Sequence, residues 1–404
     1  MHKKLWNKDF ILLFQGSTVS TIGDLMYSVA IGYWVYQKTG SNSLMGIMSA
    51  ISMFVTMFLS PFTGSIVDKC NRKWVMVGMD VMQGVLMVTV GILAYLDRLN
   101  VPGVLIAAFL AALGSVFYSP AASTLLLDIL PQDELVRGRS LYSGMTSLIE
   151  MAGTALSGVM VAFLGVPLIV VINGLSNLYA AASELLIHVP KTVQQGTSVT
   201  VKGILQDAGK AVSAIFSDNF LCLFIPSALI INFLGAGPLT LVLPFCMEKG
   251  FAVDMYGYLV TVYTTGALLS VLVLGIVKLK PAVRYWIMGL SFSCSVFFFV
   301  AAYLSKQFLP MCVMTFLGAF LNAAGNALFD ASMMQALPEE NRGAILGFIQ
   351  SASIGGSALS AVVYGLLGDL FPLSFVFAVG TGISLLPMVY MCFHRRTKEF
   401  ILNH

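Results

Sequence analysis

Residues 64–73 read GSIVDKCNRK, a short charged segment between two long apolar runs. The run before it extends from about residue 42 to 67, and the run after it from about 74 to 96. Each exceeds the roughly 20 apolar residues that an α-helix needs to cross the hydrocarbon core of a bilayer. Residues 42–96 therefore predict two membrane-spanning helices joined by a tight polar turn.

The same pattern continues through the whole chain. Of its 404 residues, 58% are apolar and 10% are charged, whereas soluble domains carry about 25% charged residues. Apolar runs predict six helices in the first half, near residues 10–36, 42–67, 74–96, 102–128, 140–164 and 166–188. Six more are predicted near 219–247, 254–277, 284–304, 308–335, 342–369 and 373–393. The predicted fold class is an all-α membrane protein with twelve transmembrane helices.

The two sets of six helices repeat one another. Gly46 and Gly257 hold equivalent places in their spans, 211 residues apart (257 − 46). Residues 150–165 and 353–368 share seven identities in sixteen positions. Recurrence at similar offsets indicates an internal duplication, so we predict two pseudo-symmetric halves.

The polar break near residues 190–218 divides the chain. We predict an N-terminal six-helix half over 1–189, a cytoplasmic linker over 190–218, and a C-terminal half with a cytoplasmic tail over 219–404. Apolar residues at helical spacing in 201–216 suit an amphipathic helix on the inner membrane surface, with a plain linker as the alternative.

Basic residues set the expected orientation. With twelve spans, only Lys38, Arg98, Lys249 and Lys306 fall on one side, which leaves 18 of the 22 Lys and Arg residues (22 − 4) on the other. Basic residues accumulate on the cytoplasmic side of membrane proteins. We therefore expect a multi-pass protein of the cell membrane with both termini in the cytoplasm.

The segment 64–73 has the spacing G-x-x-x-D-K-x-N-R-K. It closely resembles the signature Gly-x-x-x-Asp-Arg/Lys-x-Gly-Arg/Lys-Arg/Lys of the major facilitator superfamily, and the resemblance extends over the whole chain. It implies the fold of that superfamily, in which two six-helix halves expose a central site alternately. Asn71 stands where the family has glycine. This departure is mild, since asparagine tolerates the left-handed turn conformation better than other non-glycine residues.

The resemblance implies that this segment is a conformational latch, which holds the halves together on the inner side. Gly64 would allow close helix contact, Asp68 would face the N-terminus of a neighbouring helix, and Asp128 would supply the acid at the inner end of helix four. The implied latch residues are Gly64, Asp68, Lys69, Arg72, Lys73 and Asp128. For Lys69 and Lys73, simple anchoring at the interface is the alternative.

The resemblance is closest to the drug-exporting branch, which includes macrolide-efflux-like and siderophore-exporter-like proteins. It rests on residues 20–30, the turn 39–41 and residues 131–135. It implies a secondary active transporter that exports lipophilic drug-like molecules in exchange for protons. Helix four lacks the arginine of many proton antiporters, and Gly153-Thr154 replaces the usual Gly-Pro. A siderophore or lysolipid exporter and a transport-inactive sensor or scaffold are the alternatives.

Asp24 and Glu150 lie deep within predicted spans. An acid at the centre of a bilayer costs about 2.5–3.5 kcal/mol on insertion scales, so it should face a cavity or a partner. We hypothesise that both are protonatable groups that couple proton movement to export, and the alternative is that each only accepts hydrogen bonds between helices. Asp80 and Glu184 lie toward the inner ends of their helices, and we interpret both as structural.

Polar and aromatic side chains on several spans are candidates for a substrate cavity. They recur at helical spacing or sit near the middle of a span, where a lipophilic ligand would contact them. The candidates are Tyr27, Ser147, Asn232, Asn322 and Asn326. The alternative for aromatic residues is simple filling of a membrane core.

Other classes of protein lack support in the sequence. The six cysteines show no paired spacing and the four histidines lie at chain ends or span boundaries, so we expect no metal, cofactor or enzymatic centre. The net charge of +3 is dispersed, so we expect no nucleic acid. The expected partners are a small-molecule substrate, protons and membrane lipid, and the expected state is a monomer.

Overall fold

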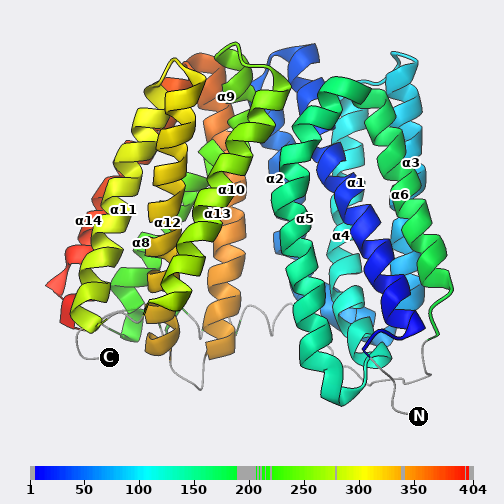
Figure 1. The fold of residues 1–404 in the computed structure, drawn as a ribbon, viewed down its shortest axis with the longest axis horizontal. Helices are drawn as coiled ribbons and strands as arrows, with labels where there is room; N and C mark the ends of the chain where they lie inside the picture. The colour runs from blue at the N-terminus through cyan, green and yellow to red at the C-terminus, as the bar shows by residue number, and fades with distance from the viewer. Residues whose placement is uncertain are drawn as a thin grey trace. The chain divides into compact units, whose positions relative to one another are not determined.

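The computed structural model describes residues 5–188, 206, 209, 212–213, 215–218, 221–277, 280–337, 342–395 and 397–399. All regular elements within these ranges are helices, and no strand is found there (Figure 1). The predicted all-α fold is confirmed. The amphipathic helix predicted over 201–216 lies largely outside the described residues.

The helix bounds follow the predicted apolar runs to within a few residues. The first half contains α1 (Lys8–Thr39), α2 (Asn42–Lys69), α3 (Arg72–Tyr95), α4 (Val101–Ile129), the 3-10 turn η1 (Gln132–Glu134), α5 (Leu135–Leu164) and α6 (Val166–Leu185). The second contains α8 (Leu221–Thr240), α9 (Val242–Glu248), α10 (Val253–Ile276), α11 (Pro281–Leu304), α12 (Phe308–Ala336), α13 (Arg342–Leu370) and α14 (Leu373–Phe393).

Ten of the described helices are long and apolar enough to cross a membrane. The helices α1 and α5 are not among these ten, although at 32 and 30 residues they are about 48 and 45 Å long. Each carries an acid within its span, Asp24 on α1 and Glu150 on α5. With these two, and with α9 continuing α8, the helices make up the predicted set of twelve.

The prediction of a single helix over residues 219–247 is wrong. The structure interrupts it after Thr240, and α9 begins at Val242. Pro238 lies inside the last turn of α8. Because proline cannot donate to the helical hydrogen-bond ladder, the helix is weakened at this point.

Helix α1 holds Asp24 well inside an uninterrupted segment. At its start, the side chain of Asn7 accepts a hydrogen bond from the backbone N–H of Phe10 at 2.8 Å. At its end, Gly40 has φ of +62° and donates to the carbonyl of Tyr36. These are a typical N-cap and a typical left-handed C-cap.

The chain divides into two compact units. Unit 1 comprises Met1–Gly40, Ile51–Thr200 and Ala252–Gly257. Unit 2 comprises Ser41–Ala50, Val201–Phe251 and Tyr258–His404. The first turns of α2 thus belong to unit 2, and the first turn of α10 belongs to unit 1.

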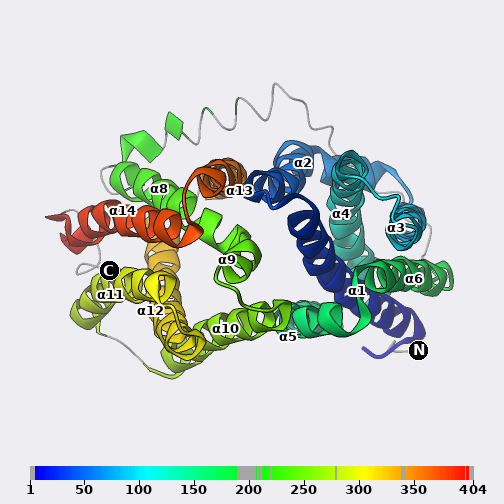
Figure 2. The ribbon, with the colours of Figure 1, turned by 90° about the horizontal axis from the view of Figure 1, so that it is seen from above.

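In unit 1, small residues let helices approach closely. Figure 2, which looks along the helices, shows α3 beside α6 and α4. A Cβ at Gly174 of α6 would come within 2.6 Å of the backbone N of Val88 on α3, and a Cβ at Gly84 would come within 3.0 Å of the Gly174 carbonyl oxygen. Such glycine contacts are typical of helix pairs in membranes.

The duplication is visible in one pair of equivalent contacts. In unit 2, a Cβ at Gly46 of α2 would overlap the carbonyl of Ala361 on α13. In unit 1, a Cβ at Gly158 of α5 would come within 2.6 Å of the Val253 carbonyl oxygen and 3.2 Å of the Gly257 nitrogen on α10. Gly46 corresponds to Gly257, and Ala361 to Gly158, in the sequence repeat. The same backbone approach therefore occurs once in each unit.

Candidate functional site

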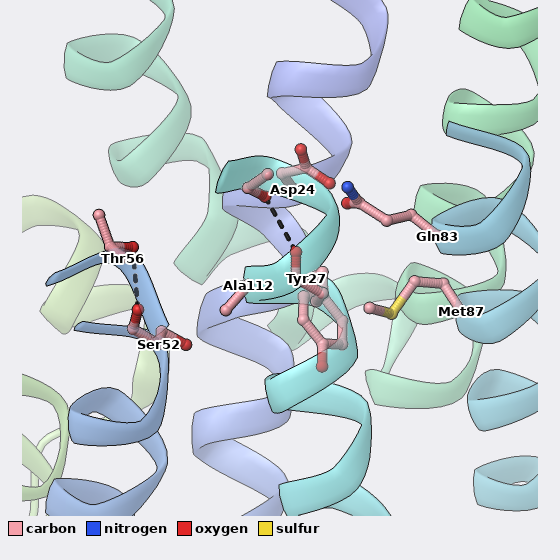
Figure 3. Close-up of a pocket in the computed structure, with 9 residues that line it drawn as sticks. Asp24, Tyr27, Ser52, Thr56, Gln83, Met87 and Ala112 are labelled. Carbon is pink, nitrogen blue, oxygen red and sulfur yellow. Dashed lines mark hydrogen bonds between the residues drawn. The ribbon is translucent and has the colours of Figure 1, made fainter. Parts of the chain in front are cut away.

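A cavity of about 220 Å³ lies within unit 1, among α1, α2, α3 and α4 (Figure 3). Its lining combines polar and apolar side chains: Asp24, Tyr27, Ser52, Thr56, Gln83, Met87, Ala111, Ala112 and Ser115. Figure 3 shows the amide of Gln83 directed toward the Asp24 carboxyl group. A cavity of this volume with polar groups in its wall is large enough for several water molecules, so Asp24 borders a space that can be hydrated.

Close packing of α1 against α6 fixes the position of Asp24. The amide of Asn177 on α6 donates to Asp24 Oδ1 at 3.3 Å and to Asn173 Oδ1 at 2.9 Å. A Cβ on the preceding residue, Gly23, would overlap the hydroxyl of Ser176 and come within 2.8 Å of Asn173 Oδ1. Only glycine at position 23 allows this approach, which brings the carboxyl group within reach of the α6 amides.

Tyr27 lies one turn along α1 from Asp24 and also lines the cavity. Its side chain is 9% exposed, and its hydroxyl has no hydrogen-bond partner among the described residues. A buried tyrosine hydroxyl is usually satisfied. The Tyr27 hydroxyl is therefore free to bind a small polar molecule such as water.

The structure does not bring Glu150 to this cavity. Both Glu150 and Ser147 are exposed side chains on α5, and neither is among the lining residues. The two acids that the sequence singled out therefore lie in different surroundings within unit 1.

The basic residues of segment 64–73 tie helices of unit 1 together. Arg72 Nη1 lies 2.6 Å from Asp128 Oδ2, and these side chains are 8% and 12% exposed. The ion pair joins the start of α3 to the end of α4. Lys73 Nζ donates to the carbonyls of Leu185 and Ile187 at 2.7 and 2.9 Å, and so caps the end of α6.

The rest of the segment is arranged differently from our expectation. Asn71 has φ of −74° and ψ of 108°, so it is an extended N-cap of α3 and not a left-handed residue. The turn needs no glycine there, because α2 ends at Lys69 and only Cys70 and Asn71 separate the helices. A Cβ at Gly64 would meet no described atom within 4 Å, so the expected close contact is not made here. The side chain of Asp68 lies outside the description, and Lys69 is exposed.

The asparagines of the second half form two separate pairs in unit 2. Asn326 donates to Asn322 Oδ1 at 2.8 Å, one turn away on α12. Asn232 Oδ1 on α8 accepts from the hydroxyl of Ser357 on α13 at 3.0 Å. Both pairs supply polar groups within helical segments, and no described contact joins them to each other.

The chain matches the sequence profile of the Major Facilitator Superfamily twice, over residues 13–245 and 227–400. The chain belongs to the major facilitator superfamily. Together with the ten apolar helices found among the described residues, this makes it a multi-pass membrane protein. The two matches cover nearly the whole chain.

Several curated relatives of this major facilitator are named as efflux proteins. It is 23% identical to macrolide efflux protein A of Streptococcus pyogenes over 186 residues, which are 46% of each chain. It is 30% identical to the multidrug efflux pump Tap of Mycobacterium tuberculosis over 162 residues, which are 39% of this chain and 38% of the pump. The chain thus spans about half the length of the curated relatives it matches.

Solved structures confirm the major facilitator fold. The nucleoside transporter NupG aligns with a TM-score of 0.71 at 13% identity, over 95% of this chain and 99% of that one. A bacterial homologue of the iron transporter ferroportin aligns with a TM-score of 0.69 at 15% identity, over 95% and 98% of the two chains. At such low identity, the likeness extends to the fold alone.

Three polar residues near Asp24 were not among the site residues predicted from the sequence. Gln83 lies on α3, and Asn173 and Asn177 lie one turn apart on α6. The spacing of the two asparagines within an apolar run was a usable signal, because amides inside a membrane span favour a facing partner. It could not show that α1 supplies that partner.

Proposed function

We propose that this major facilitator exports lipophilic drug-like molecules from the cytoplasm in exchange for protons, by alternating access. The observation that carries the proposal is the environment of Asp24. Its carboxyl group borders a partly polar cavity among α1, α2, α3 and α4, and its described hydrogen-bond donor is the neutral amide of Asn177. None of the ion pairs among the described residues includes Asp24.

A carboxyl group in these surroundings is suited to proton exchange. Its ionised form is disfavoured by low dielectric and lacks a cation to balance it. Its protonated form is neutral, and it can donate a hydrogen bond as well as accept one. Protonation of Asp24 would therefore change the hydrogen bonding between α1 and Asn177 on α6, which links proton binding to helix position.

Export and the substrate class are supported by the relatives named for macrolide and multidrug efflux. The cavity beside Asp24 is smaller than the roughly 300–1,000 Å³ of drug-sized pockets. We therefore assign it to the proton and to water, with Tyr27 at its wall. Our candidates for contact with the drug are Ser147, Asn232, Asn322 and Asn326, and Glu150 is our candidate for a second protonatable group.

We also propose that segment 64–73 controls the inner side of the transporter. The Arg72–Asp128 pair and the Lys73 cap fix the beginning of α3. The end of α2, which carries Asp68 and Lys69, is joined to this fixed start of α3 through only two residues, and Gly64 lies about one turn earlier on α2. This arrangement suits a latch. We further propose that both chain termini lie in the cytoplasm and that the transporting unit is a monomer.

Transport by purified protein in lipid vesicles tests the proposal. The vesicles receive a pH gradient and a panel of macrolides, dyes, siderophores and lysolipids. We expect a macrolide or a lipophilic dye to move against its own gradient only while the pH gradient lasts. Asp24→Asn mimics the neutral carboxyl group, and we expect it to abolish gradient-driven movement.

Asp97→Asn is the matched control, because Asp97 is 82% exposed and asparagine tolerates its φ of +53°. It should transport like the wild type. Unchanged gradient-driven export in Asp24→Asn would refute coupling through Asp24. Movement of siderophores or lysolipids alone would refute the substrate class, and the absence of any transport would favour a sensor or scaffold.

A further inference from the structure

Two further acids are buried between α3 and α6, outside the lining of the Asp24 cavity. Asp80 is 3% exposed and Glu184 is fully buried. Asp80 Oδ2 and Glu184 Oε2 have no hydrogen-bond partner among the described residues. Neither acid takes part in an ion pair within the described part of the chain.

Among the described residues, the charged and titratable groups that interact electrostatically with this pair come from three other helices. They are Asp24 on α1, Tyr118 on α4 and Tyr142 on α5, and none of them is a base. Asp80 and Glu184 also interact with each other electrostatically. The pair thus lies among groups that are neutral or negative.

The basic residues at the start of α3 are already engaged. Arg72 pairs with Asp128, and Lys73 binds the terminal carbonyls of α6. Asp80 lies eight residues beyond Arg72 on the same helix, which is about 12 Å along its axis. Neither base forms a described contact with Asp80 or Glu184.

Two carboxyl groups in this setting cannot both stay ionised. Burial disfavours each charged form, and each negative charge disfavours the other. Two neighbouring buried carboxyl groups in an enzyme share one proton for the same reason. The unpartnered oxygens of Asp80 and Glu184 mark where such a proton can sit.

A chain of hydroxyl groups leads from Glu184 to α5. Tyr118 Oη donates to Glu184 Oε1 at 2.9 Å, Ser17 Oγ lies 2.9 Å from Tyr118 Oη, and Tyr142 Oη donates to Ser17 Oγ at 3.0 Å. Each hydroxyl has one hydrogen to donate. Since Tyr118 uses its hydrogen on Glu184, Ser17 must donate to Tyr118. All three bonds therefore point toward the carboxyl group.

We propose that Asp80 and Glu184 form a proton-binding site inside unit 1, and that Tyr118, Ser17 and Tyr142 are the path by which its proton is exchanged. When a proton enters, Tyr118 gives its hydrogen to Glu184 Oε1 and receives the hydrogen of Ser17. Ser17 in turn receives the hydrogen of Tyr142, and a proton from water restores Tyr142. Every O–H bond that breaks on a hydroxyl is replaced by another, so only Glu184 gains a proton. Release follows the same path in reverse after the three hydroxyl groups have turned away from Glu184.

Infrared spectroscopy of the purified protein tests the site directly. We expect the wild type at neutral pH to show the carbonyl band of a buried, protonated carboxylic acid. Glu184→Gln or Asp80→Asn should remove this band or shift it. Tyr118→Phe retains both acids and removes one donor to Glu184, so it should move the band to higher frequency and slow its hydrogen–deuterium exchange.

Two matched substitutions serve as controls. Asp133→Asn removes an exposed carboxyl group, and Tyr179→Phe removes the hydroxyl of a tyrosine that is 46% exposed on α6. Neither should change the band. A spectrum in which all buried carboxyl groups are ionised, or a band that survives both acid substitutions unchanged, would overturn the proposal. If an acid variant fails to fold, the frequency shift in Tyr118→Phe decides the matter.

The use of this proton in transport rests on the proposed function, but its presence does not. In the vesicle assay, we expect Tyr118→Phe to slow gradient-driven export several-fold and Tyr179→Phe to leave it unchanged. If wild-type protein shows the band and no proton-driven export, the proton site stands and the proposed function fails. Proton-driven export without the band means that the proton site fails and the proposed function stands.

Discussion

The hydroxyl of Tyr364 donates a hydrogen bond at 2.7 Å to the carbonyl of Leu234. In a regular helix, this carbonyl would accept from residue 238, which is a proline and has no N–H. Tyr364 on α13 therefore supplies the donor that α8 lacks. A Cβ at Gly237 or Gly380 would overlap the tyrosine, so the break between α8 and α9 is stabilised by one tyrosine held between two glycines.

Replacing this tyrosine tests whether its hydroxyl stabilises the break. Tyr364→Phe keeps the ring and removes the donor. We expect the free energy of unfolding to fall by about 1–3 kcal/mol, because a buried carbonyl is left unsatisfied. Thermal unfolding in detergent measures the effect, with Tyr258→Phe, at a residue 52% exposed on α10, as a neutral control. Equal stability of the two variants would mean that Leu234 finds another donor.

The extent of the helices was predictable, and the break in α8 was not. Apolar runs bounded by charged or turn residues fix where a membrane helix begins and ends, so α13 matched its predicted range to within one residue. The run over 219–247 is equally apolar, and a proline inside a membrane helix is often tolerated. Whether it interrupts the helix depends on donors from other helices, here Tyr364.

The depth of the acids within their spans was predictable from the sequence. What their side chains contact was not. The sequence placed Asp24, Asp80 and Glu184 within spans, because depth follows from position along a helix. It could not show that Asp80 and Glu184 are both buried and interact electrostatically, since that depends on how α3 packs on α6. The extended backbone at Asn71 was not predictable either, because it is determined by the start of α3.

The glycine before Asp24 should be intolerant of any side chain. Gly23→Ala places a Cβ onto the Ser176 hydroxyl, so α1 and α6 must separate. We expect a loss of about 1–3 kcal/mol from overpacking, together with weakened gradient-driven export. Gly78→Ala on α3 is the control, since a Cβ there meets no described atom within 4 Å. Adding Ser176→Ala to Gly23→Ala should restore part of the lost stability, and the absence of any recovery would contradict this packing.

Replacing one partner of the Arg72–Asp128 pair should destabilise the protein more than replacing both partners together. Asp128→Asn leaves a buried guanidinium without its carboxylate, and such losses are about 3–5 kcal/mol. Arg72→Met combined with Asp128→Leu should melt closer to the wild type than either single variant. Lys38→Met breaks the exposed pair with Asp97 and should change stability by less than about 1 kcal/mol. Additive losses in the double variant would show that the pair is not an energetic unit.

The Asp369 carboxylate should slow amide hydrogen exchange in the first turn of α2. Its carboxylate accepts from the backbone N–H groups of Asn42 and Ser43 at 2.6 and 3.2 Å, and from the Ser41 hydroxyl at 3.0 Å. The first N–H groups of a helix have no partner inside it, and a negative charge there is favourable. In Asp369→Asn only one acceptor oxygen remains and the charge is lost. We expect amide hydrogen exchange at Asn42 and Ser43 to become roughly 5–30-fold faster, which corresponds to a loss of about 1–2 kcal/mol.

The amide of Leu373, which Glu248 caps at 3.0 Å, is an internal control that should not change in this variant. Unchanged exchange at Ser43 would mean that the carboxylate does not stabilise this turn.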